Sequence, residues 1–471
     1  MSDSSVKNNI KVPKIIGLIV FILLLIYILA AYFFVSHYTY GTYISGTDCS
    51  FKSKEEVYSS FSNKHIDESV ILIGRNGYEW NFFSDDINSD IVYDLSGLER
   101  NNGSILDEIN WVKNCYSGKH IDIKADFVFE DEAFLETLEG SPLCIKSGAI
   151  EPKDAYLAGY DEEASAFIIK EGNPGNILDR KKTLQVVRDA LCGVNIQDKV
   201  VKIDLNEADC FKKSNMSVEN IKLIHEKEKA DKMLQAKISY DWNGVRVIVD
   251  GSVIKDWIDI EDNVAVLNSD KVLSYLMQVA DDNDTYNKPM TFWTATGHRK
   301  TIKRGNYGWK TDVDKEAELL IDDVLLGRQV SREPIYSHTA YVKGQNDVGD
   351  TYVEVDLANQ HLYLIVNGKI DYESDVVSGN VSAGHNTPDG IYGVTYKTVN
   401  ATLRGPGYES FVYYWMPYNG GVGLHDATWR GKFGGEIYKY SGSHGCVNLP
   451  LATAKYIYGV VETGFPVVTY W

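Results

Sequence analysis

One stretch near the C-terminus determines how the whole chain is interpreted: Tyr440-Ser441-Gly442-Ser443-His444-Gly445-Cys446-Val447-Asn448-Leu449-Pro450. Cys446 directly follows Gly445, and a glycine lets the backbone pass close to a bound substrate, or take a positive φ, without a steric penalty. A thiol at this point is exposed to whatever docks against the glycine. The second half of the constellation lies upstream in Gly423-Leu424-His425-Asp426, with seventeen residues between His425 and Ser443.

These residues suit nucleophilic catalysis by a cysteine. A cysteine attacks a carbonyl as its thiolate, and its ordinary pKa of ~8.5 leaves little thiolate at neutral pH without a nearby base. His425 can be that base, because the pKa of a histidine is about 6.5. Asp426 is expected to fix the tautomer of His425, through either its backbone carbonyl or its side chain. The N–H groups of Gly445 and Cys446 are expected to hold the oxyanion of acyl transfer.

Two other roles compete with catalysis. Taken alone, Cys446 fits a small buried hydrophobic residue, which is a common role for a cysteine. His425, His444 and Cys446 also have the side chains of zinc ligands, but no fourth ligand is spaced nearby. The motif and its spacing together favour the nucleophile, so we expect neither a metal ion nor an organic cofactor.

The same residues point to a family. His425 followed by Ser443-His444-Gly445-Cys446-Val447-Asn448 resembles the signature of the L,D-transpeptidases, the YkuD family of enzymes that cross-link peptidoglycan. The resemblance extends from about Thr351 to Trp471. Three further stretches carry it: Tyr352-Val353-Glu354-Val355-Asp356-Leu357, Thr387-Pro388-Asp389-Gly390-Ile391-Tyr392 and Tyr414-Trp415-Met416-Pro417.

The resemblance implies a reaction and its partners. Cys446 would attack the carbonyl between the L-centre of the third stem-peptide residue and the following D-alanine. D-Alanine leaves, a thioester forms, and a side-chain amine of a neighbouring stem attacks it to give a 3→3 cross-link. His425 would activate Cys446 and then protonate the leaving amine. The partners are thus a tetrapeptide donor and an amine acceptor of peptidoglycan.

The remaining motif residues receive their roles from the same resemblance. His444 counts among the catalytic residues, and Ser443 and Asn448 would support the loop. Trp429 and Arg430 would line the substrate cleft, with a packed tryptophan and a surface arginine as the alternative. Three consecutive residues offer backbone N–H groups to the oxyanion: His444, Gly445 and Cys446.

Two other functions remain open from the sequence. With water as the acceptor the enzyme would be an L,D-carboxypeptidase, because acceptor choice depends on the shape of the cleft and the exclusion of water. A wall-binding scaffold with an inactive enzyme is a further alternative, which the intact motif disfavours. A net charge of −19 argues against nucleic acid, because phosphate binding needs clustered lysines and arginines.

An apolar run near the N-terminus predicts a membrane anchor. Ile15–Val35 contains 21 residues without a charge, enough for a helix across the ~30 Å hydrocarbon core. Lysines precede the run and none follows closely, so the positive-inside rule places residues 1–14 in the cytoplasm and the enzyme outside, facing the cell wall. A cleaved signal peptide is the alternative, but its apolar region is usually shorter. The lysines that decide the orientation are Lys7, Lys11 and Lys14, against Lys52 and Lys54 after the run.

The region between anchor and enzyme predicts α+β modules. A short stalk and a first module are expected over residues 36–150. Residues 151–336 resemble the peptidoglycan-binding module often found before this catalytic domain, and two hairpin-then-helix patterns within them, at 155–191 and 237–279, suggest a duplication. A linker is expected at 337–350. The residues that carry the module resemblance are Thr285-Tyr286, Phe292-Trp293-Thr294-Ala295-Thr296 and Gly305-Asn306-Tyr307-Gly308-Trp309.

Residues 351–471 predict a mostly-β catalytic domain, a pair of sheets made from short alternating strands and glycine-rich turns. One helix is expected just after the motif, from Pro450 to Gly464, and Pro466 to Tyr470 is expected to close the domain as a strand. Five cysteines lie outside the motif, which indicates no complete disulfide framework; one or two disulfides stay open. They are Cys49, Cys115, Cys144, Cys192 and Cys210.

Overall fold

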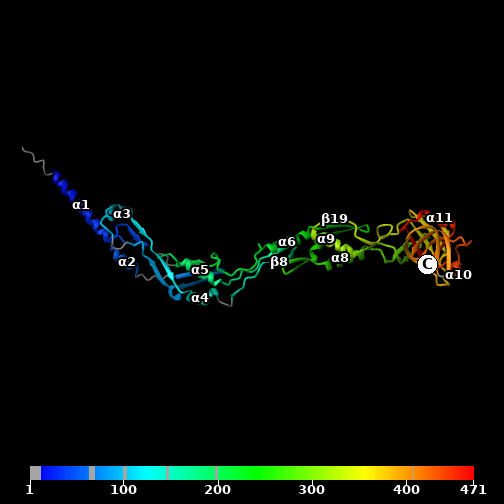
Figure 1. Cartoon of the computed structure of the whole chain (residues 1–471), viewed down its shortest axis with the longest axis horizontal. Coiled ribbons are helices and arrows are strands. Elements are labelled where there is room, and N and C mark those ends of the chain that lie inside the picture. The colour runs from blue at the N-terminus through cyan, green and yellow to red at the C-terminus, as the bar shows by residue number, and fades with distance from the viewer. Residues whose placement is uncertain (1–11, 63–68, 99–102, 145–147, 197–199, 406) are drawn as a thin grey trace, which may run out of the picture. The chain divides into compact units, whose positions relative to one another are not determined.

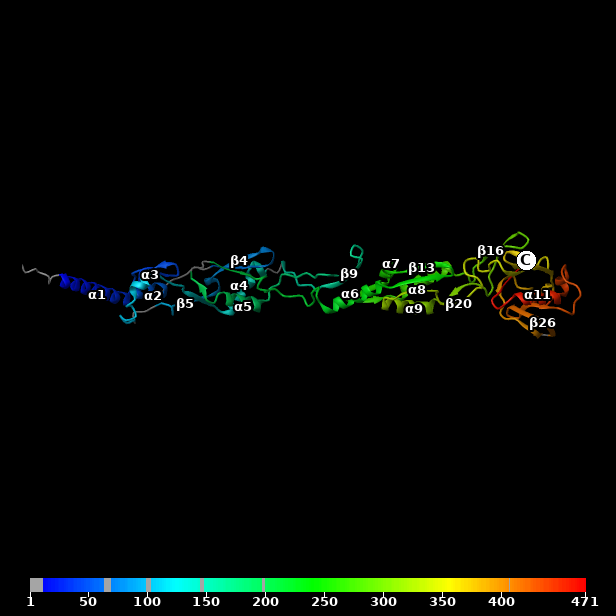
Figure 2. The same ribbon diagram turned by 90° about the horizontal axis from the view of Figure 1, so that it is seen from above.

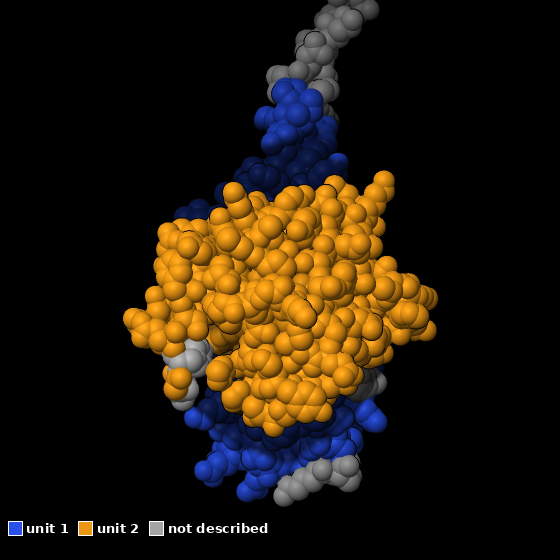
Figure 3. Space-filling view, turned by 90° about the vertical axis from the view of Figure 1, so that its right-hand side faces the viewer, with its two compact units in different colours: residues 1–155, 171–217 blue, residues 156–170, 218–471 orange. Residues whose placement is uncertain are grey.

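The computed structural model describes residues 12–62, 69–98, 103–144, 148–196, 200–405 and 407–471. The chain divides into two compact units, coloured separately in Figure 3. The first unit holds Met1–Ala155 and Glu171–Ser217, and the second holds Tyr156–Lys170 and Val218–Trp471. The module predicted over residues 151–336 is therefore split between the units. The chain leaves the first unit for one hairpin and then returns, and no composition shift in the sequence signals such an excursion.

The apolar run near the N-terminus lies in helix α1, Val12–Ser36. By length and composition this helix is a candidate membrane span, and little of it is buried inside the protein. Lys14 lies in its first turn, whereas Lys7 and Lys11 lie outside the described residues.

Beyond α1, the described residues of the first unit form three small sheets with helices packed on them. The strand orders are β2-β1-β6, β10-β7-β5 and β11-β3-β4. The predicted stalk does not extend freely, because Thr42 and Ile44 are buried and their strand pairs in parallel with β6. The strands are β1 Thr42–Ile44, β2 Thr47–Asp48, β3 Ser69–Ile73, β4 Glu79–Phe83, β5 Asp90–Asp94, β6 Lys119–Ile121, β7 Lys124–Val128, β10 Val194–Asn195 and β11 Val200–Asp204; the further helices are α2 Lys54–Ser62, α3 Trp111–Ser117, α4 Asp131–Gly140 and α5 Arg180–Ala190.

The second unit begins with an α+β region. Hairpin β8–β9 forms where the sequence predicts it, but its expected helix, α5, belongs to the other unit, so the predicted duplication is not present in that form. Hairpin β12–β13 turns at Asn243-Gly244, both with positive φ, and β19 joins it in parallel. Figure 2 shows α7, α8, α9 and β13 together in this region. The elements are β8 Tyr156–Asp161, β9 Ala166–Lys170, α6 Ile221–Leu234, β12 Lys237–Trp242, β13 Val245–Val249, α7 Gly251–Ile254, β14 Ile258–Glu261, β15 Val264–Leu267, α8 Ser269–Asn283, β16 Met290–Trp293, β17 Arg299–Ile302, β18 Lys310–Thr311, α9 Val313–Leu326, β19 Gln329–Arg332 and β20 Tyr336–His338.

The C-terminal region contains the predicted pair of sheets. One has the order β23-β22-β21-β29-β24 and the other β25-β26-β27-β28. The expected helix follows the motif as α11, and the expected last strand is β29, which pairs in parallel with β21. The elements are β21 Tyr352–Asp356, β22 His361–Val366, β23 Lys369–Asp375, β24 Gly390–Gly393, β25 Thr398–Gly405, β26 Tyr408–Asn419, β27 Val422–Asp426, α10 Ile437–Ser441, β28 Val447–Leu449, α11 Leu451–Val460 and β29 Pro466–Tyr470.

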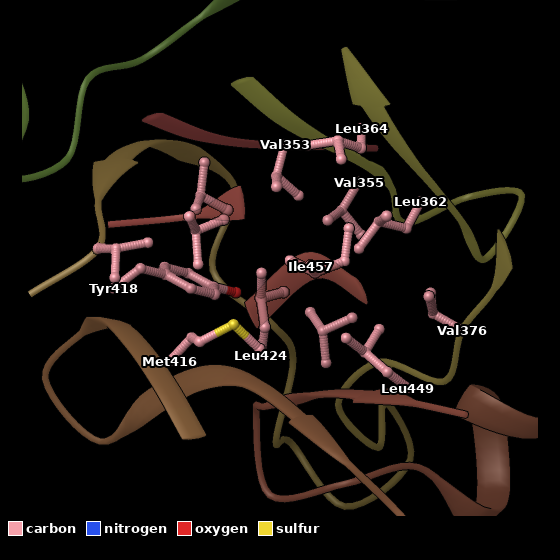
Figure 4. Packing of buried hydrophobic residues seen from close by; sticks show 14 of the residues in the cluster. Val353, Val355, Leu362, Leu364, Val376, Met416, Tyr418, Leu424, Leu449 and Ile457 are labelled. Atoms are coloured by element: carbon pink, nitrogen blue, oxygen red, sulfur yellow. The ribbon is translucent and has the colours of Figure 1, made fainter. Parts of the chain in front are cut away.

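The core of this region lies between the two sheets and α11. Figure 4 shows Ile457 of α11 between Val355 and Leu362 of the first sheet and Leu424 and Leu449 of the second. All five side chains are fully buried. The sheet that carries the functional motif, β25 to β28, is therefore held from beneath by a continuous apolar core, which fixes the positions of β27 and β28.

Residues 290–311 and the predicted linker pack onto the first sheet. Phe292 and Ile302 share a buried cluster with Ile391, and the Gly305 N–H donates to the carbonyl of Ile391 at 2.9 Å. The linker at 337–350 is not free, because Asp347 is fully buried and pairs with buried Arg304 at 2.5 Å. The α+β region and the sheet pair thus share a second core rather than meeting through a flexible connection.

Candidate active site

His425 lies in β27, an inner strand of the four-stranded sheet β25-β26-β27-β28. Its Nδ1 lies 2.8 Å from the backbone carbonyl oxygen of Asp426, which can only accept, so Nδ1 carries the ring proton and Nε2 is an acceptor. The ring is buried, and this desolvation lowers the pKa of His425 below its ordinary value, against the weaker opposing effect of the Asp426 carbonyl. The imidazole is therefore neutral, with a proton-free Nε2.

Asp426 orients His425 through its backbone, which the sequence left open. Its side chain has another partner: Oδ1 accepts from the Tyr414 N–H at 2.8 Å. Oδ2 is buried and meets no hydrogen-bond partner among the described residues. The carboxylate therefore joins β27 to β26, while the carbonyl sets the tautomer of the histidine.

Cys446 directly precedes β28 and is largely buried. Its Sγ donates to the carbonyl of Gly421 at 3.5 Å. Burial raises the pKa of the Cys446 thiol to about 11, and the Gly423 N–H opposes this only in part. The side chain is thus a protonated thiol at neutral pH.

The strand register brings Cys446 and His425 to one face. Strands β27 and β28 run in parallel with His425 opposite Asn448. Side chains alternate along a strand, so Cys446, two residues before Asn448, shares the face that His425 occupies. The seventeen residues between His425 and Ser443 are spanned by one loop and the short helix α10.

Ser443 closes the loop between α10 and β28, residues 442–446, through two hydrogen bonds; this segment is called the motif loop below. Its hydroxyl donates to the Cys446 carbonyl at 2.5 Å and accepts from the Gly445 N–H at 3.0 Å. Gly445 has a φ of +120°, a conformation that side-chain-bearing residues rarely adopt. The Gly445 N–H is therefore engaged, which corrects the expectation that it holds the oxyanion.

Asn448 links His425 to Arg430. With the amide oriented to suit both neighbours, its Nδ2 donates to His425 Nε2 at 3.2 Å, and its Oδ1 accepts from Arg430 Nη2 and Nε at 3.1 and 3.2 Å. Both Nη atoms of Arg430 also donate to the Ser441 carbonyl at 3.2 Å. Arg430, expected in the substrate cleft, is half-buried and ties the motif loop to the histidine instead.

The two remaining predicted residues have exposed side chains. Trp429 is half-exposed with its ring centroid 6.0 Å from that of His425. The His444 ring is exposed and lies 4.7 Å from the His385 ring. Both are therefore accessible to a ligand, while His425, Cys446 and Asn448 are not exposed.

The zinc site considered as an alternative role for His425, His444 and Cys446 lacks a set of ligands in the described residues. Among the described residues, no three histidine, cysteine, aspartate or glutamate side chains lie together in a way that could hold a metal ion. All six cysteines lie within the described ranges and none of them forms a disulfide.

Comparison with known proteins follows this geometry. The chain matches the family of the L,D-transpeptidase catalytic domain (YkuD) over residues 350–469, and the family described as "Putative peptidoglycan binding domain" over residues 218–331. The crystal structure of a cysteine-to-serine mutant of the Enterococcus faecium L,D-transpeptidase is 34% identical; the match covers 51% of this chain and 97% of that one, with a TM-score of 0.45. This chain belongs to the L,D-transpeptidase family.

Two further L,D-transpeptidase structures match the C-terminal region. The catalytic domain of the E. faecium L,D-transpeptidase acylated by ertapenem is 46% identical and covers 26% of this chain and 97% of that one, with a TM-score of 0.24. The L,D-transpeptidase of Stackebrandtia nassauensis is 31% identical over 26% of this chain and 56% of that one, with a TM-score of 0.23. No curated protein sequence matches this chain.

One residue of this L,D-transpeptidase site was missed by sequence reasoning. Thr387 is buried, donates to the Gly445 carbonyl at 2.7 Å and accepts from the Gly379 N–H at 2.9 Å. Residues 377–380 run beside the motif loop, where the Ser443 N–H donates to the Ser378 carbonyl at 3.0 Å. The Thr387-Pro388-Asp389-Gly390 stretch was a sequence signal, but it did not reveal which loop it supports.

Proposed function

We propose that this chain is a peptidoglycan L,D-transpeptidase that forms 3→3 cross-links between stem peptides through a thioester on Cys446. One observation carries the proposal: the thiol of Cys446 and the proton-free Nε2 of His425 share one face of the parallel pair β27–β28. The family of the chain and its match to a peptidoglycan-binding domain support peptidoglycan as the substrate.

The reaction has two steps that share one proton carrier. Cys446 Sγ attacks the carbonyl that precedes D-alanine, the thiol proton passes to His425 Nε2, and the C–N bond breaks as D-alanine takes that proton. The amine of a neighbouring stem then attacks the thioester and loses a proton to His425. The histidine returns it to sulfur as the C–S bond breaks, which restores the starting enzyme.

The resting enzyme holds its proton on sulfur. Burial raises the pKa of Cys446 to about 11 and lowers the pKa of His425, so a preformed thiolate–imidazolium pair is disfavoured. We therefore assign His425 as a general base that takes the proton while the C–S bond forms. Asn448 supports this state, because its amide donates to Nε2 and so favours the neutral ring.

The groups around this pair receive supporting roles. We assign the Cys446 N–H to the oxyanion, since the Gly445 N–H is engaged by Ser443. Trp429 and His444, whose side chains are exposed, are assigned to substrate contact. Asp426 fixes the tautomer of His425 through its carbonyl.

The upstream regions locate the enzyme. We assign wall binding to residues 218–331 and membrane anchoring to α1, with the N-terminus in the cytoplasm and the catalytic domain facing the cell wall. This arrangement serves cell-wall synthesis at a surface where stem peptides lie outside the membrane.

The decisive experiment incubates the detergent-solubilised full chain with a disaccharide-tetrapeptide and weighs the products. A cross-linked dimer with release of D-alanine supports the transpeptidase. A tripeptide without dimer assigns water as the acceptor and makes the enzyme an L,D-carboxypeptidase, and unchanged substrate removes the catalytic function. Cys446→Ala is the matched control and should return unchanged substrate.

A further inference from the structure

A short segment of the first unit lies against the C-terminal half of helix α1. Helix α3 lies beside α1 in Figures 1 and 2. Together with the turn before it, over residues 104–117, it contacts α1 where Trp111 meets two aromatic rings of that helix. The Trp111 ring lies 5.5 Å from those of Tyr27 and Phe34, and its Nε1 donates to the Tyr27 carbonyl at 3.2 Å. The Tyr27 hydroxyl in turn donates to the Ile109 carbonyl.

These contacts place the segment beside the apolar part of α1, not beyond the end of that helix. Tyr27 lies nine residues before Ser36, the end of α1, which at 1.5 Å per residue is about 13 Å along the helix. Over that length the side of α1 that Trp111 does not cover stays apolar and exposed, at Ile28, Leu29 and Phe33. If lipid covers those side chains, then residues 104–117 lie at the same level.

The segment itself exposes an apolar surface. Leu106 is 72% exposed and Tyr116 is 95% exposed. Apolar side chains gathered in this way are unusual on a water-facing surface and mark a contact with a membrane or a partner. The exposed apolar residues of the segment are Ile105, Leu106, Ile109, Val112 and Tyr116.

The two acidic residues of the segment differ in exposure, because Glu108 is largely buried and Asp107 is exposed. Glu108 pairs with Lys54 at 2.9 Å, and both side chains are largely buried. The Asp107 carboxylate accepts from the Ser104 N–H at 2.8 Å. Lys113 is exposed, and a lysine at a membrane surface extends its ammonium group to the lipid headgroups. Glu108 is therefore paired within the protein, and the exposed Asp107 and Lys113 would lie at the level of the headgroups while the apolar side chains enter the lipid.

We propose that residues 104–117 form a second membrane contact, an interfacial segment seated in the outer leaflet beside α1. The occupant is the lipid bilayer, because the segment packs through Trp111 against the candidate span, which exposes apolar side chains over the same length. Tryptophan and tyrosine are enriched at this level of a membrane, as Trp111 and Tyr116 would be here. The inference rests on the proposed anchoring by α1.

The test uses the full chain reconstituted into phosphatidylglycerol–phosphatidylcholine vesicles. A phosphatidylcholine with a photoactivatable diazirine in its acyl chain labels the side chains that touch lipid, and peptide masses locate the label. We expect label on both α1 and residues 104–117. The double variant Leu106→Asp/Val112→Asp should lose the label on the segment and keep it on α1. Val128→Lys, an exposed position on β7 of the same unit, is the matched control and should leave both labels unchanged.

The outcomes separate the inference from the anchor on which it rests. Label on α1 without label on residues 104–117 in the unmodified chain overturns the interfacial segment and leaves the anchor standing. An unlabelled α1 overturns the anchor and the segment together. This reading does not depend on the folding of any variant, because the unmodified chain gives it alone.

Discussion

The Asn448 amide donates to Nε2 of His425 at 3.2 Å, so the nitrogen that takes the thiol proton in the proposed mechanism is already held as an acceptor. The carbonyl of the same amide is fixed by the guanidinium of Arg430. The histidine is thus restrained at both ring nitrogens, by the Asp426 carbonyl at Nδ1 and by Asn448 at Nε2. A protonated ring would face the donor end of Asn448, which disfavours the imidazolium.

Replacing Arg430 should change the pH dependence of acylation. The positive charge of Arg430 contributes to the lowered pKa of His425, although burial contributes most. The base works only as neutral imidazole, so the rate falls as the pH drops through this pKa. Arg430→Gln should raise the pKa and move the acidic limb of kcat/KM to higher pH, whereas Arg430→Lys should move it less. An acidic limb that stays in place in Arg430→Gln contradicts the link.

Cys446 should carry the covalent adduct of a carbapenem. In the proposed mechanism Cys446 is the nucleophile, and a strained β-lactam carbonyl would acylate the same sulfur that forms the thioester. Cys446→Ala should lose both the adduct and turnover while keeping the fold, and Cys446→Ser should be nearly inactive because a hydroxyl is much harder to deprotonate. Peptide mass mapping checks this, with the other five cysteines as internal controls. An adduct on one of those would remove Cys446 as the nucleophile.

His425→Ala should slow acylation about 10²–10⁴-fold at neutral pH, as is typical for the loss of a general base. The rate of this variant should then climb about tenfold per pH unit from pH 7 upward, because the thiolate fraction grows in that way below a pKa of about 11. The unmodified enzyme should climb less steeply. Stopped-flow acylation across this range tests both slopes, and a flat profile for His425→Ala would mean that the thiol ionises near neutrality.

Thr387→Val should disturb the motif loop from below. The substitution preserves shape but leaves the Gly445 carbonyl and the Gly379 N–H without this partner, at a cost of about 1–3 kcal/mol for each buried group. We expect a lower Tm and slower acylation. Thr387→Ser keeps the hydroxyl and should retain most of both properties. Equal Tm values for the Val variant and the unmodified chain would exclude the supporting role.

Gly305→Ala should weaken the contact between residues 290–311 and the sheet pair. A Cβ at this glycine would lie 2.1 Å from the ring of Tyr392, which is itself buried. Overpacking of this kind costs about 1–3 kcal/mol. Gly459→Ala, where a Cβ meets no atom within 4 Å, is the control and should be neutral or slightly stabilising. Denaturant unfolding measures the free energy of unfolding of both variants. Equal values would show that the contact at Gly305 accommodates the added methyl group without a loss of stability.

The local structure of the catalytic region was largely predictable from the sequence. Alternation in Tyr352–Asp356 and His361–Val366, and the turn at Asn367-Gly368, predict adjacent antiparallel strands because period and turn chemistry act over short distances. The helix after Pro450 follows for the same reason. The motif also indicated which residues to expect at the site, because its identities and spacing could be compared with the signature of a family.

Contacts between distant segments were not predictable. Thr387 reaches Gly445 across 58 residues, and β16–β17 packs on a sheet that begins at Tyr352. Arg430 was expected at the substrate because it follows His425 closely in the sequence, and nothing in the sequence reveals the Asn448 carbonyl that holds it. The Gly445 N–H was expected at the oxyanion because it lies next to Cys446. The sequence does not reveal that the Ser443 hydroxyl accepts from this N–H.

The burial of Cys446 has a consequence for the lifetime of the enzyme. Oxidants and small disulfides react with exposed thiolates, so susceptibility rises with thiolate fraction and access. A thiol that is 9% exposed, with its pKa raised to about 11, offers little of either. If the catalytic domain faces outward as proposed, the reductants of the cytosol do not reach Cys446. The same burial that makes the sulfur dependent on His425 would then limit its oxidation between turnovers.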